Sequence, residues 1–87
     1  MTTNHKDASL AALLAPYKMI AIAAAVRVDM ATVRRWYRGR SLPRPQNYRA
    51  LAGFLRMSVE DLADLIAEDS KRMALARVSL ERAREVA

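Results

Sequence analysis

Seven arginines and one acidic residue lie between positions 27 and 49 of this 87-residue chain. The acid is Asp29, and the arginines are Arg27, Arg34, Arg35, Arg38, Arg40, Arg44 and Arg49. Arg34, Arg35 and Arg38 recur at helical spacing, so they fall on one side of a short helix. Guanidinium groups bind phosphate and the acceptor edge of guanine through paired hydrogen bonds. This spacing predicts a helix that presents a basic face to DNA.

Residue types that support catalysis or metal binding are scarce in the chain. His5 is the only histidine, there is no cysteine, and no glycine-rich phosphate loop is present. The acids between residues 60 and 69 are interpreted as a solvated face at the start of a helix. The sequence therefore argues against an enzyme, and we expect no catalytic residue, no metal, no cofactor and no small-molecule substrate.

Charge is polarised along the chain. The net charge is +6, yet residues 27 to 49 alone carry seven bases and one acid, which is +6, while residues 58 to 70 carry five acids and no base, which is −5. A basic surface alone would suit a membrane or simple solubility as well as a nucleic acid. Its concentration in one segment favours a polyanionic partner.

Composition and length favour a single all-α domain. Hydrophobic residues make up 53% of the chain and aromatic residues only 6%, with alanine and leucine dominant. The apolar run from Leu10 to Val26 resembles a signal peptide, but Pro16, Tyr17 and Lys18 interrupt it, which favours buried helices. No segment approaches the ~20 apolar residues of a membrane span. We therefore expect a soluble, cytoplasmic protein with no membrane partner.

Local signals divide the first half of the chain into helices. Residues 1–6 are expected to be a disordered leader, and Asp7 or Ser9 to cap a first helix that ends near Ala15. A second helix is predicted from about Lys18 to Ala25. The pair Arg27-Val28 then forms a turn, and Asp29 caps a third helix over residues 30–38 that Gly39 ends in the left-handed conformation.

The second half of the chain has fewer signals for where helices begin and end. Residues 40–44 are predicted as a loop, and Pro45 suits the first position of a fourth helix. Ser58 and Asp61 resemble a capping box for a fifth helix. No breaker follows Leu62, which leaves open whether the tail is one helix or two. We assign residues 7–67 to one domain and residues 68–87 to a C-terminal helical extension.

The third helix separates into two faces when its residues are placed at about 100° intervals. One face, within about 140° of arc by the same period, holds Met30, Ala31, Arg34, Arg35 and Arg38. The opposite face holds Thr32, Val33, Trp36 and Tyr37. Trp36 is therefore assigned to the core. The basic face fits a major groove, where arginine reads guanine and small apolar groups contact the thymine methyl.

Residues 22 to 62 carry a longer pattern: Ile22-Ala23-x-x-Val26-x-Val28-x-x-x-x-Val33-x-x-Trp36-x-x-Gly39, then Pro43, then Leu51-Ala52-x-x-Leu55-x-Met57-Ser58-x-x-x-Leu62. This pattern resembles the helix-turn-helix domain of the Cro and cI phage repressors and the wider XRE regulators. The resemblance implies a five-helix lambda-repressor-like helix-turn-helix domain that binds double-stranded DNA, in the bacterial cytoplasm and associated with the nucleoid. It implies base-reading positions at Met30, Ala31, Arg34 and Arg35, and phosphate contacts from Lys18, Arg27, Arg38, Arg40 and Arg44.

Three positions depart from the family pattern. The usual turn glycine is Arg27, and holding a non-glycine residue at positive φ costs on the order of 1 kcal/mol or more. Met19 stands where these proteins often have a phosphate-binding glutamine, so that contact is either absent or made by Lys18. Asp29 would place a negative charge near DNA unless it caps the helix or accepts from a cytosine amine.

The tail repeats apolar residues at spacings of three and four, namely Met73, Ala76, Leu80, Ala83 and Ala87. This narrow seam predicts dimerisation through Met73, Ala76, Leu80 and Ala83. The alternative is that the tail folds back on its own domain or frays. We also expect two stabilising i,i+4 ion pairs, Glu68 with Arg72 and Arg77 with Glu81.

Three functions are compatible with these features. The leading one is a dimeric, sequence-specific transcriptional regulator of the phage or prophage repressor type. The second is an excisionase-type architectural factor, since Thr32-Val33-Arg34-Arg35-Trp36 also resembles the winged-helix excisionase motif. The third is an antitoxin whose tail holds a toxin protein. An excisionase wing would need a strand hairpin after the third helix.

Overall fold

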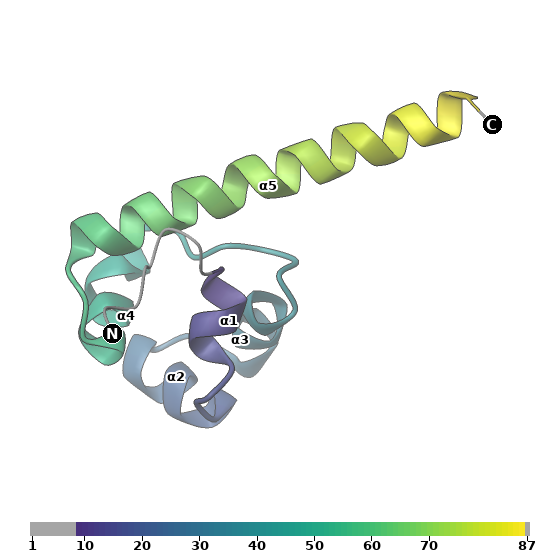
Figure 1. The fold of residues 1–87 in the computed structure, drawn as a ribbon. Helices are drawn as coiled ribbons and strands as arrows, with labels where there is room; N and C mark the ends of the chain where they lie inside the picture. The colour runs from purple at the N-terminus through teal and green to yellow at the C-terminus, as the bar shows by residue number, and fades with distance from the viewer. Residues whose placement is uncertain (1–8, 87) are drawn as a thin grey trace.

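The computed structural model describes residues 9–86, and these residues form helices joined by short connections (Figure 1). The α-helices are α1 (Leu10–Leu14), α2 (Met19–Val26), α3 (Met30–Tyr37), α4 (Tyr48–Leu55) and α5 (Val59–Val86), and a 3-10 turn, η2 (Pro45–Asn47), precedes α4. No strand occurs among the described residues. The all-α class predicted from composition is therefore confirmed. The expected leader at residues 1–6, Asp7 and Ala87 lie outside the described residues.

Capping side chains fix where the helices begin. The Ser9 hydroxyl accepts a hydrogen bond of 3.1 Å from the Ala12 amide at the start of α1. At the start of α5 the Ser58 hydroxyl accepts from the Asp61 amide at 3.0 Å. The structure thus selects Ser9 from the two caps expected for the first helix and confirms Ser58 for the fifth. In both, a short side-chain oxygen satisfies an amide that has no partner within the first helical turn.

The start of the fourth helix differs from its prediction by more than one residue. Pro45 does not begin the fourth helix but opens the 3-10 turn η2, in which the Asn47 amide donates to the Arg44 carbonyl at 2.9 Å. Regular α-helix begins only at Tyr48. Proline has no amide to donate, so it fits either kind of helical start equally well, and the sequence did not distinguish them.

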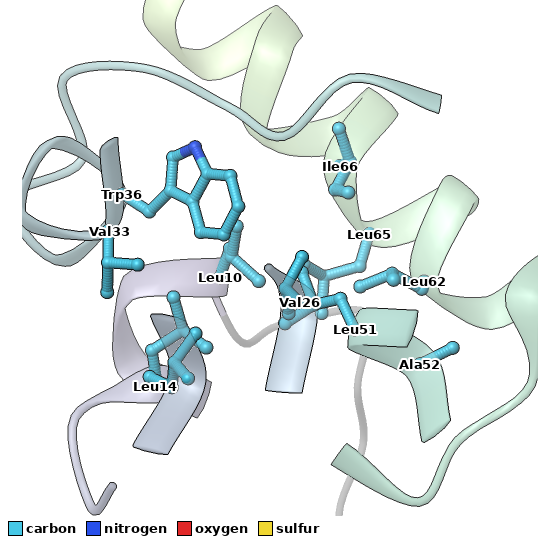
Figure 2. Packing of buried hydrophobic residues seen from close by; sticks show 11 residues of the cluster. Leu10, Leu14, Val26, Val33, Trp36, Leu51, Ala52, Leu62, Leu65 and Ile66 are labelled. Atoms are coloured by element: carbon cyan, nitrogen blue, oxygen red, sulfur yellow. The ribbon is translucent and has the colours of Figure 1, made fainter. Parts of the chain in front are cut away.

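The core draws residues from all five α-helices (Figure 2). Leu10 and Leu14 of α1, Ile22 and Val26 of α2, Val33 and Trp36 of α3, Leu51 and Ala52 of α4, and Leu62, Leu65 and Ile66 of α5 are buried. Tyr17, between α1 and α2, adds an edge-to-face contact with Phe54 of α4, with ring centroids 5.0 Å apart. The apolar run from Leu10 to Val26 thus supplies two packed helices. Within the described residues, no helix combines the length and the apolar character that crossing a bilayer requires.

Helix α5 is a single helix of 28 residues, which answers the question that the sequence left open. Its first half packs on the body of the protein through Leu62, Leu65 and Ile66, whereas its second half extends away from the other helices (Figure 1). No glycine or proline occurs between residues 59 and 86 to end it.

Asp69 of α5 contacts the start of α1, and its burial overturns one prediction. Only 8% of this residue is exposed, so it is not part of a solvated acidic face. Its carboxylate accepts a 2.7 Å hydrogen bond from the Leu10 amide at the start of α1 and lies 3.1 Å from the Arg72 guanidinium. A buried carboxylate needs such partners to offset the loss of its hydration.

The ion pairs expected along the tail also differ from those found. Arg72 pairs with Asp69 and not with Glu68, and Glu68 pairs with Lys71 at 3.4 Å. Arg77 and Glu81 make no ion pair within 4 Å. Arg72 reaches the more buried carboxylate, where the local dielectric makes a charge pair stronger.

Candidate nucleic-acid interface

A three-residue connection joins α2 to α3 and sets the angle between them. Arg27 is left-handed, with φ 60° and ψ 50°. Its amide donates to the Ala23 carbonyl at 2.8 Å, and the Val28 amide donates to the same oxygen at 3.2 Å. Val28 is half-buried against the core. The departure from glycine at position 27 therefore leaves a regular left-handed helix end, not a distorted turn.

Asp29 begins α3 as its N-cap. Its Oδ1 accepts from the Thr32 amide at 2.7 Å. Hydrogen bonds from the Thr32 hydroxyl and amide lower the pKa of the Asp29 carboxyl below 3.8, and the nearby Arg35 charge lowers it further. The acid that departed from the expected pattern is thus used to satisfy the helix start, where a negative charge also interacts favourably with the helix dipole.

Helix α3 is divided into a buried and an exposed side, as its phasing predicted. Val33 is fully buried and Trp36 is 2% exposed, and both point into the core (Figure 2). Met30 is 38% exposed, and three arginines and one alanine share its side of the helix and are exposed, namely Ala31, Arg34, Arg35 and Arg38. We call these five residues the α3 face.

The last turn of α3 closes with hydrogen bonds that hold the following loop. Gly39 is left-handed, with φ 65°, as predicted. Its amide donates to the Trp36 carbonyl at 3.1 Å, and the Arg40 amide donates to the Arg35 carbonyl at 2.9 Å. These two hydrogen bonds form a Schellman motif, which fixes the direction in which the chain leaves the helix at Arg40.

The arginines of this region are free of acidic partners within residues 9–86. The ion pairs found there join Lys71 to Glu68 and Arg72 to Asp69, both on α5. Arg35 Nη2 donates a hydrogen bond of 3.4 Å to the hydroxyl of Thr32, a neutral partner. Their charge is therefore not neutralised within the described chain.

Charge is divided between the helical body and α5. Residues 9–58 contain nine basic residues and one acid, a net charge of +8. Residues 59–86 contain five basic residues and seven acids, a net charge of −2. The body that carries α3 is thus much more basic than the chain as a whole, which favours approach to a polyanion.

The remaining basic residues named from the resemblance come from other segments. Lys18 is the N-cap residue of α2, Arg27 lies in the α2–α3 connection, and Arg40 and Arg44 lie in the loop after α3. All four are exposed. Met19, in the place of the family's glutamine, is half-buried and packs against the core. It therefore contributes to folding and offers no polar contact.

A second left-handed arginine was not predicted. Arg56 ends α4 with φ 57° and ψ 48°, and it is exposed. A signal existed, because arginine, an apolar residue and a capping residue follow α4 in the same order as they follow α2. Reading Met57-Ser58 against Val28-Asp29 would have found it.

The α3 face is thus an exposed surface whose arginines have no acidic partner among the described residues. The helix that carries it is held on the core by Val33 and Trp36. Comparison with known proteins gives no match to a protein family model, a curated protein or a solved structure.

Proposed function

We propose that this chain is a sequence-specific DNA-binding transcriptional regulator in which α2 and α3 form a helix-turn-helix. The observation that carries the proposal is the division of α3 into a buried side and the α3 face. Because Val33 and Trp36 hold the helix on the core, the opposite side can enter a groove without disturbing the fold.

On this proposal four of the five residues of the α3 face read base edges in the major groove. Arg34 and Arg35 donate to guanine O6 and N7, and Met30 and Ala31 contact apolar groups such as the thymine methyl. Lys18, Arg27, Arg38, Arg40 and Arg44 contact phosphates, which position the protein without reading sequence.

The division between base reading and phosphate contact gives a direct test. Sites are first selected from a random pool of duplex DNA with the full chain. Arg35→Ala is expected to relax specificity at one base position, at a cost of about 1–3 kcal/mol for the preferred base. Arg40→Ala is expected to weaken binding to all sequences alike and to reduce the salt slope by about one unit.

A matched control uses a basic residue on a different helix. Arg82 is exposed on α5, so Arg82→Ala removes the same charge without touching the α3 face. Its effect on affinity and on the selected sequence is expected to be small. If Arg35→Ala leaves the selected site unchanged, the groove assignment of α3 is wrong, and if no sequence is enriched at all, the proposed function is wrong.

The excisionase alternative needs a β-hairpin wing. In the structure the chain from residue 39 to residue 58 forms a loop, the turn η2 and α4, with no strand. This observation favours the regulator over the winged-helix alternative. The antitoxin alternative is compatible with the same DNA-binding body and differs from the regulator only in what the tail binds.

A further inference from the structure

The outer segment of α5, residues 73–85, carries an apolar stripe that continues the buried side of the same helix. Leu62, Ile66 and Asp69 alternate at spacings of four and three and face the body of the protein. Met73, Ala76, Leu80 and Ala83 continue this alternation beyond the body. Met73 is half-buried at its edge, and Ala76, Leu80 and Ala83 are exposed, Leu80 to 59%. The stripe therefore extends a packing surface that its own body does not cover.

A second group of apolar side chains lies on the opposite side of the outer segment. Leu75 and Val78 are 66% and 48% exposed. By the helical period, Lys71 and Arg82 occupy the adjoining positions of that side. Covering Leu75 and Val78 with another helix would also bury those two charges, which is costly without partners. The stripe from Met73 to Ala83 contains no charge, so it is the better docking surface.

We propose that the stripe packs against the same stripe of a second copy of this chain, with the two α5 helices antiparallel. In that register Leu80 lies opposite Ala76 of the second copy, and Met73 lies opposite Ala83 of the second copy. Each layer then combines one large and one small side chain, which fills the space between the helices evenly. A parallel pair would place leucine against leucine and alanine against alanine, alternately overfilling and underfilling the layers.

The antiparallel register also sets the distance between the two bodies. Its centre lies at residue 78, and Ile66 marks the docked part of α5, twelve residues earlier. At 1.5 Å per residue, the two docked parts are about 36 Å apart along the paired helices. Half-sites read by paired helix-turn-helix units are one DNA turn apart, about 34–36 Å between the DNA-reading helices. The separation of the two docked parts of α5 is of the same order as this spacing. That comparison rests on the proposed function, whereas the packing of the stripe does not.

Charges beside the stripe predict a weak dimer. Arg77 and Arg84 occupy one edge of it, and in the antiparallel register Arg77 lies beside Arg84 of the second copy. The overlap of the two stripes is only about three helical turns long, which belongs with interfaces that bury less than about 1,200 Å². Added salt is expected to strengthen the dimer by screening these arginines. Two half-sites on one duplex would strengthen it further by holding both copies together.

The first test compares two exposed leucines of the outer segment. Leu80→Lys places an ammonium group in the proposed interface and is expected to raise the dimer dissociation constant at least about tenfold. Leu75→Lys makes the same change on the opposite side and is expected to leave it unchanged. Sedimentation equilibrium of the full chain, over a range of concentrations and salt, measures both. A monomeric wild-type chain at high micromolar concentration, or equal effects of the two variants, would overturn the proposal.

The second test determines the register. The chain has no cysteine, so Ala76→Cys and Leu80→Cys each introduce a single thiol. When the two variants are mixed and oxidised, the antiparallel register brings unlike cysteines together, and the mixed disulfide is expected to exceed both homodimers. Homodimers in excess, from cysteines facing their own copies, would show a parallel pair and overturn the register.

The two proposals fail in distinguishable ways. The mixed disulfide is formed without DNA, so its formation supports the dimer whether or not the chain binds DNA. If the disulfide forms but the chain without a cross-link enriches no sequence from the random pool, the proposed function is wrong and the dimer stands. If the chain binds a single half-site but no mixed disulfide forms, the proposed function stands and the antiparallel dimer is wrong.

Discussion

Two connections in this molecule have the same backbone construction but lead into helices of different character. The α2–α3 connection consists of Arg27, Val28 and Asp29, and the α4–α5 connection consists of Arg56, Met57 and Ser58. In each, the arginine is left-handed, with φ and ψ of 60° and 50° at the first and 57° and 48° at the second. The apolar residue is half-buried against the core, and its amide donates to a carbonyl five residues earlier, at 3.2 Å and 3.0 Å. The last residue caps the next helix.

The two connections differ in the helix that follows each of them. The first leads into the eight residues of α3 and the α3 face, and the second leads into α5, whose first turn holds Glu60 and Asp61. A left-handed arginine is therefore a property of a short connection between packed helices and does not by itself indicate DNA binding. Any role of Arg27 at phosphate must come from its side chain, and Arg56 supplies a natural control for it.

The largest expected effect is on the left-handed backbone itself. Arg27→Val and Arg56→Val place a β-branched residue at positive φ, where its Cβ substituents clash with the backbone. We expect each variant to lose about 1–2 kcal/mol of unfolding free energy. Urea denaturation followed by circular dichroism measures the loss. Should one variant lose nothing, its connection does not have the left-handed geometry and the likeness between the two fails.

Replacing the caps is expected to have the next largest effect. Asp29→Ala and Ser58→Ala each remove the oxygen that accepts an amide in the first helical turn, at a cost of about 1 kcal/mol. The same denaturation experiment compares them, and the Asp29 variant is expected to lose slightly more because its charge also interacts with the helix dipole. A much smaller loss at Ser58 would mean that the long helix α5 does not depend on its cap as the short helix α3 does.

Features fixed by neighbours in sequence were predictable, and features fixed by distant partners were not. Asp29, Gly39 and Ser58 act within three residues of themselves, so the chain alone revealed their roles. The two sides of α3 followed from helical period. Asp69 could not be placed, because the amide it accepts from belongs to Leu10, 59 residues earlier.

Arg56 shows a different reason for a missed prediction. Arginine is not a residue type that favours positive φ, so residue type alone does not mark it. The local signal was the likeness of Arg56-Met57-Ser58 to the segment from residue 27 to residue 29. Its conformation is imposed by the packing of α4 and α5 on the core. In the candidate site, exposure of the basic residues was foreseeable from their charge. On the proposed function, the position of bound DNA decides which of them contact phosphate, and that position is set by the assembled surface and not by a local pattern in the sequence.

A glycine at either left-handed position is expected to have a smaller effect, of opposite sign. Arg27→Gly and Arg56→Gly relieve the positive-φ strain but add freedom to the unfolded chain, so we expect each to gain no more than about 0.5 kcal/mol. On the proposed function, the affinity for DNA and its salt dependence distinguish the two variants. Arg27→Gly is expected to weaken binding and to lower the salt slope by about 0.9, while Arg56→Gly changes neither. Equal salt slopes for the two variants would remove Arg27 from the phosphate contacts.

The smallest expected effect is the pH dependence that distinguishes the two caps. Hydrogen bonds from Thr32, and the charge of Arg35, lower the pKa of the folded Asp29 carboxyl below 3.8, whereas the Ser58 hydroxyl does not titrate in this range. A carboxyl whose pKa is lower in the folded state binds its proton more readily in the unfolded state. Its contribution to stability is therefore complete above pH 3.8 and is lost as the pH falls through the lower, folded pKa.

Asparagine caps a helix about as well as aspartate and carries no charge, so Asp29→Asn isolates this contribution. The difference in unfolding free energy between the wild-type chain and Asp29→Asn is expected to be constant from neutral pH down to about 3.8, and then to shift in favour of the variant. Other carboxylates titrate in both proteins and cancel in the difference. A difference that stayed constant through this range would mean that Asp29 is no better stabilised as a carboxylate in the folded chain than in the unfolded one, and the two connections would then be alike in their caps as well as in their backbones.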